Sequence, residues 1–255
     1  MPKAEIRVHA NLEELSRAAA ELFVVTANTC VAATGNFFAA FSGGATPRRL
    51  YELLATSDYS DRIAWPRVHL FQVDERSVPP DHPESNFRMI RETLLVPSGM
   101  PPANFHRMAG EAADAAEAAR RYQEEIGRVV PAREGGFPRF DLILLGMGND
   151  GHTASLFPGS PALDEQRRWV CPSSPGASGL PRLTLTFPLL NAAAQIVFLV
   201  SGSEKAATLR RVLEDPPQPR LLPAQGIRPV NGRLVWYVDE AAAAQLQRVA
   251  GGIND

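Results

Sequence analysis

The chain has few of the features that mark metal sites, membrane segments and secreted proteins. Its two cysteines, Cys30 and Cys171, lack the spacing of a metal site. No apolar run approaches the roughly 20 residues that a membrane-spanning helix needs. The first ten residues, MPKAEIRVHA, lack the apolar core of a secretory signal. We therefore expect a cytoplasmic protein with reduced cysteines, no membrane partner and no metal.

Positive charge is also scarce. The 26 basic residues are outnumbered by 28 acidic ones, so the formal net charge is −2, and no run of like charges forms a binding tail. Nucleic acid is therefore not an expected partner, and any anionic ligand must be small and held locally. Lysine occurs only at Lys3 and Lys205, and every other basic residue is arginine.

Strand patterns alternate with helix patterns along the 255 residues. Short, mostly apolar runs predict strands over 36–41, 68–73, 141–145, 168–171, 195–200 and 234–238. A run of alternating apolar and polar residues predicts a further strand over 183–187. Helical spacing predicts helices over 12–31, 48–55, 86–95 and 111–130, from Lys205 to 213, and after Asp239. This alternation predicts an α/β fold with a doubly wound, largely parallel sheet and helices on both faces. We expect a single domain over residues 1–255.

Four polar residues stand where a helix is expected to begin. Asn11, Thr46, Ser85 and Asp239 each precede a helical pattern, and side chains of this type cap the first backbone N–H groups. Pro47 fits the first turn after Thr46. These residues predict where the helices begin.

The segment 140–159, FDLILLGMGNDGHTASLFPG, carries the strongest signal for chemistry. A buried strand ends at a glycine turn, and polar residues follow at the position where open α/β sheets bind ligands. His152 is the first candidate for a catalytic residue. The alternative is that Asp150 and Thr153 only cap a following helix, with His152 on its surface.

A second glycine turn, Ser42-Gly43-Gly44, lies between a predicted strand and a predicted helix. Free backbone N–H groups and the helix dipole make such a turn an anion site, and phosphate is the expected anion. Ser42 and Thr46 flank the glycines. The alternative is a plain turn that needs glycine for its backbone conformation.

Charged residues follow two further predicted strands. Asp74, Glu75 and Arg76 lead into a proline-rich segment that ends at Asn86, and we interpret this segment as an active-site loop, the alternative being solvated charge. Lys205 follows the 195–200 strand, and in a chain of arginines it is a candidate for holding a phosphate, the alternative being a surface lysine. The Pro/Ser/Gly-rich segment 172–181 is interpreted as a loop whose composition permits motion. The candidate residues are all expected to lie just after strands, and this shared position favours one composite site.

Five motifs in this order resemble the 6-phosphogluconolactonases of the pentose phosphate pathway. They span nearly the whole chain: FSGGATP (41–47), VDERSVPPDHPESN (73–86), LGMGNDGHTASLFPG (145–159), PRLTLTFPLLN (181–191) and VSGSEKA (200–206). The resemblance implies hydrolysis of 6-phospho-D-glucono-1,5-lactone to 6-phosphogluconate, without a cofactor. We expect a monomer or a small homo-oligomer.

The resemblance also implies roles for individual residues. His152 matches the family's catalytic histidine. Positions that match the sugar-phosphate site are Gly43, Gly44, Thr46, Arg182 and Lys205, and those that match the lining around the ring are Asp74, Arg76 and Asp150. Ser42, Asn86 and Gly151 lie within the same motifs and are expected to contact substrate. In this mechanism His152 takes a proton from water and returns it to the ring oxygen, while Asp150 orients the imidazole. Backbone N–H groups of the 146–151 turn, or Arg76, would stabilise the oxyanion.

Three alternatives stay open. A deaminase or isomerase would use the same fold, but in glucosamine-6-phosphate deaminases the motif continues through Phe-Asn-Glu-Pro, whereas this chain has Ser155-Leu156-Phe157-Pro158. A non-catalytic sugar-phosphate sensor would be expected to carry a DNA-binding segment. A metallohydrolase using Asp150 and His152 lacks a third clustered ligand.

Overall fold

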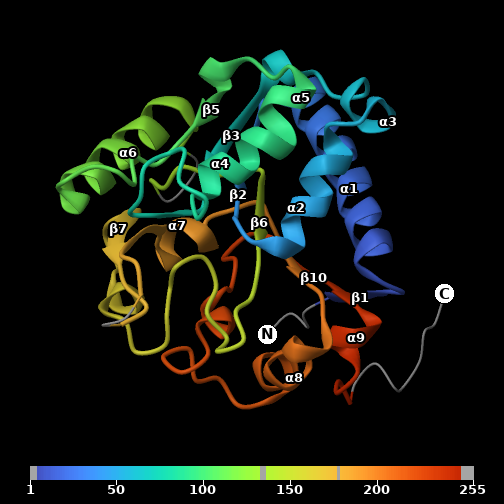
Figure 1. Ribbon diagram of the computed structural model, residues 1–255, viewed down its shortest axis with the longest axis vertical. Coiled ribbons are helices and arrows are strands. Elements are labelled where there is room, and N and C mark those ends of the chain that lie inside the picture. Colours follow the sequence, from blue (N-terminus) through green and yellow to red (C-terminus); the bar gives the residue numbers. More distant parts are fainter. Residues whose placement is uncertain (1–4, 133–135, 177–178, 248–255) are drawn as a thin grey trace.

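A parallel β-sheet forms the centre of the computed structural model, which describes residues 5–132, 136–176 and 179–247 (Figure 1). In these ranges the sheet has seven strands, in the order β1 (Glu5–His9), β10 (Arg233–Asp239), β9 (Gln195–Val200), β6 (Leu142–Leu145), β2 (Phe37–Phe41), β3 (Val68–Gln72) and β5 (Phe105–His106). Every neighbouring pair is parallel. The predicted parallel α/β fold is confirmed.

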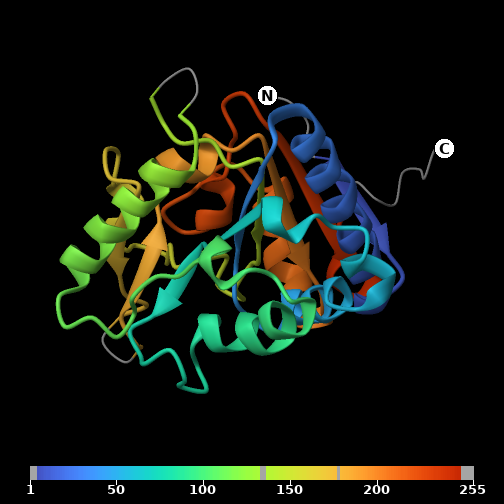
Figure 2. The same ribbon diagram turned by 90° about the horizontal axis from the view of Figure 1, so that it is seen from above.

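Helices cover both faces of this sheet (Figures 1 and 2). The helices are α1 (Leu12–Thr34), α2 (Ala45–Leu54), α3 (Ser57–Ser60), α4 (Asn86–Ile90), α5 (Val96–Ser98), α6 (Ala115–Val129), α7 (Phe187–Asn191), α8 (Ala206–Glu214) and α9 (Glu240–Ala243). Strand β2 has the sequence FFAAF and is buried at all five positions. Phe37 and Phe41 pack with residues of α1 and α2, whereas Phe38 packs with residues of α6 and α7. A strand between two helical layers has no solvent face, so it reads as a continuous apolar run.

Three of the four predicted helix caps are confirmed. The side chain of Asn11 accepts a hydrogen bond from the N–H of Glu14, that of Ser85 from Arg88, and that of Asp239 from Ala242. Thr46 was a wrong prediction, because α2 already begins at Ala45 and the capping position belongs to Gly44, which has a φ of 108°. No side chain caps this helix, so its first N–H groups remain available to a ligand.

Other helix boundaries differ from the expected ones for local reasons. Helix α6 begins at Ala115 and not at 111, because the Asp114 carboxylate accepts the N–H groups of the first turn. Helix α4 ends at Ile90 and continues as a π-helical turn over Arg91–Leu95.

A small antiparallel sheet was not predicted. It consists of β4 (Asp74–Arg76), β8 (Arg182–Leu185) and β7 (Val170–Ser173), and it lies beside α6 and α7 in Figure 1. The expectation that all candidate residues follow strands was therefore wrong for Asp74, Arg76 and Arg182, which lie within strands. Strands β1 and β5 were also missed. The two sheets share one hydrophobic cluster, while the single-domain assignment stays a prediction.

The order of the strands places a ligand site between β2 and β6. From β2 the chain builds outward through β3 to β5, then returns to β6 on the other side of β2 and continues to β9 and β10. Open parallel sheets bind ligands at such a reversal, beyond the carboxyl ends of the strands.

Candidate active site

A cavity of about 380 Å³ lies at this reversal. Its wall comes from the turns after β2, β6 and β9 and from the small sheet. Ten of the predicted site residues line it: Ser42, Gly43, Gly44, Thr46, Asp74, Arg76, Asn86, His152, Arg182 and Lys205. Asp150 and Gly151 are not among the lining residues.

The glycine turn after β2 is fixed by Ser42. Its N–H and Oγ both donate to the carbonyl of Leu144, at 3.2 and 2.9 Å, and its own carbonyl accepts from the Tyr51 hydroxyl at 2.7 Å. These bonds tie the turn to β6 and α2. The uncapped N-terminus of α2 is thereby held against the cavity, where its N–H groups suit an anion.

Asn86 joins this turn to the small sheet. Its Nδ2 donates to the carbonyl of Asp74 at 2.9 Å, and its Oδ1 accepts from the Arg76 guanidinium. A Cβ on Gly43 would overlap the Asn86 amide. Glycine is therefore required at position 43, because only a residue without a Cβ leaves room for the Asn86 amide between the turn and Arg76.

Two arginines face each other across the β4–β8 pair. Arg76 is the register partner of Arg182, and like charges in this arrangement are unfavourable. Both Nε atoms are buried without a hydrogen-bond partner in the described part of the chain. Burial, followed by the charge of Arg76, lowers the pKa of Arg182. An anionic ligand would satisfy these donors and offset the repulsion.

His152 is oriented by Asp150. The distance from Nδ1 to the Asp150 Oδ1 is 2.6 Å, and the same oxygen accepts the His152 backbone N–H at 3.1 Å. Burial tends to raise the pKa of Asp150, but the hydrogen bonds and charge of His152 outweigh it, so this pKa is lowered. An ionised carboxylate only accepts, so Nδ1 carries a proton, and in the neutral form of the imidazole Nε2 therefore has the free lone pair.

The turn that carries His152 is supported from behind and contains no helix. Gly151 has a φ of 81° and lies under Leu222, and its carbonyl accepts from the N–H of Ala224 at 2.9 Å. Thr153 donates to the carbonyl of Gly146. The alternative in which Asp150 and Thr153 cap a helix is therefore wrong.

Two expected oxyanion donors are already used within this turn. The N–H of Gly151 donates to the Gly148 carbonyl at 3.0 Å, and the N–H of Gly148 donates to the His152 carbonyl at 2.9 Å. Gly151 therefore turns the chain and does not contact the cavity, contrary to expectation.

Ser155 is a site residue to which sequence reasoning gave no role. Its Oγ donates to Asp74 Oδ2 at 2.6 Å, its N–H donates to Thr184 at 3.1 Å, and its carbonyl accepts from Ser173 at 2.5 Å. Ser155 thus holds one carboxylate oxygen of Asp74, and Asp74 also lines the cavity. Ser155 lay in the central motif, but its partners are distant in sequence, so no local signal identified the role.

Lys205 reaches the same cavity from the turn after β9. Gly202 begins this turn with a φ of 104°, and its N–H donates to the Asp239 carboxylate. The Lys205 ammonium forms no ion pair with any residue that the structure describes. A free cation in this position suits a phosphate.

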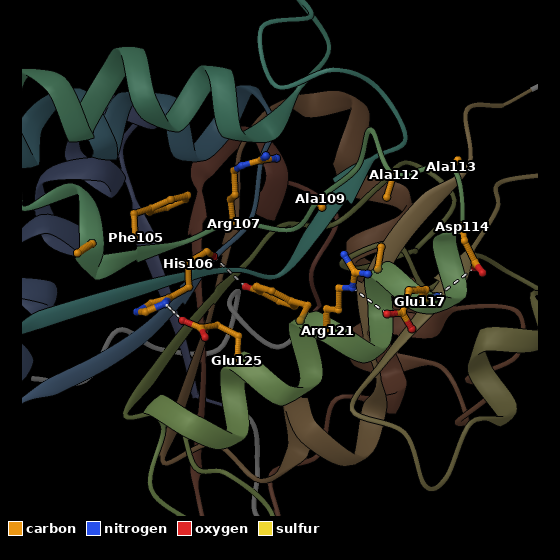
Figure 3. A pocket seen from close by; sticks show the side chains of 13 residues that line it. Phe105, His106, Arg107, Ala109, Ala112, Ala113, Asp114, Glu117, Arg121 and Glu125 are labelled. Carbon is orange, nitrogen blue, oxygen red and sulfur yellow. Dashed lines mark hydrogen bonds and ion pairs between the residues drawn. The ribbon is translucent and has the colours of Figure 1, made fainter.

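A second cavity, of about 510 Å³, lies between β5 and α6 (Figure 3). Its charged groups satisfy one another: His106 Nδ1 lies 2.7 Å from Glu125 Oε1, and Arg121 pairs with Glu117 at 2.8 Å. Burial lowers the pKa of His106 despite Glu125. This cavity therefore lacks the unmatched cations of the first.

Two classes of feature are absent from the described residues. No group of three or more His, Cys, Asp or Glu side chains is placed to hold a metal ion within these residues. Over the same ranges, no helix has the length and apolar character to span a membrane.

Comparison with known proteins identifies the family to which the chain belongs. Residues 10–236 match the model of glucosamine-6-phosphate isomerases/6-phosphogluconolactonase. A 6-phosphogluconolactonase of Synechocystis is 42% identical over 217 residues, covering 85% of this chain and 88% of that protein. One from Nostoc is 36% identical, covering 89% and 91%. The solved 6-phosphogluconolactonase of Trypanosoma brucei superimposes with a TM-score of 0.85 at 28% identity, covering 96% and 99%.

Proposed function

Because the chain belongs to the family of glucosamine-6-phosphate isomerases and 6-phosphogluconolactonases, we propose that it hydrolyses 6-phospho-D-glucono-1,5-lactone to 6-phosphogluconate, the second step of the oxidative pentose phosphate pathway. One observation carries this proposal above all. An Asp-oriented histidine lines the same small cavity as two arginines and a lysine, and none of these three cations forms an ion pair with a residue that the structure describes.

His152 acts as the general base in this proposal. Its Nε2 takes a proton from water while the water oxygen attacks the lactone carbonyl carbon. When the bond from that carbon to the ring oxygen breaks, the imidazolium returns the proton to the departing oxygen. Asp150 stabilises the charged imidazole between these steps and keeps Nδ1 directed toward itself. The product is the open-chain acid, so atoms and protons balance without a cofactor.

The cationic part of the wall binds the phosphate. Gly43, Gly44 and Thr46 present the α2 N-terminus, and Arg182 and Lys205 supply charge. Asp74, Arg76 and Asn86 bind the ring hydroxyls. Ser42 contributes indirectly, because its hydrogen bonds hold the glycine turn in the position that binds the phosphate. The proposal extends to a monomer or small homo-oligomer in the cytoplasm, which size-exclusion chromatography and cell fractionation test.

The deaminase alternative makes a different prediction. Opening a sugar ring and moving a proton between carbons requires acid and base groups at several steps. Here the carboxylate of the deaminase motif is replaced by Ser155-Leu156-Phe157-Pro158, and one oxygen of the nearby Asp74 is occupied by Ser155.

We therefore expect no ammonia from glucosamine 6-phosphate and no isomerisation of ribose 5-phosphate by protein that hydrolyses the lactone rapidly. An ammonia assay and a ketose assay on the same preparation measure this. Deamination at a rate comparable to hydrolysis would contradict the proposal. A protein that binds 6-phosphogluconate but leaves the lactone at its spontaneous rate would be the sensor.

Chelation separates the proposal from a metallohydrolase. Water activated by histidine needs no metal, and the described residues offer no three-ligand cluster. Lactonase activity is expected to survive prolonged dialysis against EDTA without loss. Loss of activity that is restored by one added metal would favour the metallohydrolase.

A further inference from the structure

The Glu75 carboxylate lies buried between β4 and the start of α4, with 2% of the residue exposed. Its Oε1 accepts the N–H groups of Arg76 at 2.7 Å and Asn86 at 2.8 Å. Its Oε2 accepts from Gln72 Nε2 at 2.9 Å, Ser85 Oγ at 3.0 Å and the Phe87 N–H at 2.8 Å. The charge is thus satisfied by five hydrogen-bond donors.

These bonds join two segments that the 77–84 loop separates. Two donors, from Gln72 and Arg76, belong to the strand side of the loop, and three, from residues 85–87, belong to the helix side. Hydrogen bonds to an ionised acceptor are stronger than neutral ones and hold their donors more firmly. Glu75 therefore fixes the backbone of Asn86 relative to β4.

The position of Asn86 in turn shapes the cavity. Its side chain touches the Gly43 turn on one side and the Arg76 guanidinium on the other, and all three residues line the cavity. Glu75 itself is not among the lining residues. A shift of residues 85–87 would move the Asn86 amide. The Arg76 guanidinium would then lose its hydrogen bond to Asn86 and would no longer be held opposite Arg182.

We propose that Glu75 is a positioning residue for substrate binding: it holds Asn86, and through it Gly43 and Arg76, in the geometry that accepts the sugar phosphate. This inference rests on the proposed function. Because Glu75 acts on the binding wall and not on the Asp150–His152 pair, it affects KM and product affinity more than kcat.

The test is Glu75→Gln, which keeps the shape but replaces one accepting oxygen by an NH₂ group that faces two or three donors. Glu165→Gln is the matched control, since the Glu165 carboxylate also accepts two backbone N–H groups, from Arg167 and Arg168, but is not among the cavity's lining residues. We expect Glu75→Gln to raise both KM for the lactone and Kd for 6-phosphogluconate about tenfold, with kcat within about threefold. Glu165→Gln should leave all three unchanged.

Ser85→Ala keeps the inference testable if Glu75→Gln does not fold. It removes one donor to Glu75 and the cap of α4, whereas Asn11→Ala removes the cap of α1 far from the cavity. Ser85→Ala should raise KM and Kd about threefold, and Asn11→Ala should raise neither. Folded Glu75→Gln protein with KM and Kd within twofold of wild type would overturn the positioning role alone. Wild-type protein that neither hydrolyses the lactone nor binds 6-phosphogluconate would overturn the proposed function and this inference together.

Discussion

Replacing His152 by alanine is expected to lower kcat about 10²–10⁴-fold, the usual contribution of general acid–base catalysis, with little change in KM. The proton transfers assigned to His152 belong to the transition state, so their loss spares ground-state binding. The His152 side chain hydrogen-bonds to Asp150, on its own turn, so the fold should tolerate the change, which a thermal melt checks.

Asp150→Asn provides the companion measurement. An asparagine at position 150 can donate to Nδ1 as well as accept from it, so the imidazole tautomer with the proton on Nε2 becomes more populated and a smaller fraction of the molecules has a base at Nε2. We expect a fall in kcat smaller than that of His152→Ala. If His152→Ala kept more than half of the wild-type kcat, His152 would have no place in the mechanism.

Arg182→Ala and Lys205→Ala are expected to give the largest effects on binding. A hydrogen bond to a charged group contributes about 1.5–3 kcal/mol, and 1.4 kcal/mol is a factor of ten, so each change should raise KM for the phosphorylated lactone about tenfold or more. Some loss of kcat is expected, because remote binding energy also positions the ring. Steady-state kinetics on the purified variants measure both quantities.

The control for this pair is Arg121→Ala, which removes an arginine from the wall of the other cavity (Figure 3) and should leave KM unchanged. The non-phosphorylated lactone should be a poor substrate for the wild type and should lose little more in the variants. Equal losses on both lactones would show that Arg182 and Lys205 do not bind the phosphate.

Long apolar elements were predictable from sequence because burial determines their pattern. Strand β9 was predicted with its observed bounds, and β2 within one residue, since both lie between helical layers and consist almost entirely of apolar residues. Strand β4 was missed for the opposite reason. Asp74 and Glu75 are buried through hydrogen bonds and not through apolar contact, so no alternation marks the strand.

The candidate site was predictable in outline for a topological reason. Turns after parallel strands meet at one edge of the sheet, so His152, Gly43 and Lys205 were expected together, and the cavity contains all three. Contacts between distant segments were not predictable. Leu222 covers Gly151, and Ser155 binds Asp74, and neither pair is joined by any local pattern in the sequence.

The most direct test of the account measures lactone hydrolysis by wild type and His152→Ala side by side. Freshly prepared 6-phosphogluconolactone is added, product formation is coupled to oxidation of 6-phosphogluconate, and the spontaneous rate is subtracted. The account predicts a wild-type rate proportional to enzyme concentration and a rate for folded His152→Ala lower by at least about 10²-fold. A wild-type rate equal to the spontaneous one, or equal rates for the two proteins, would contradict it.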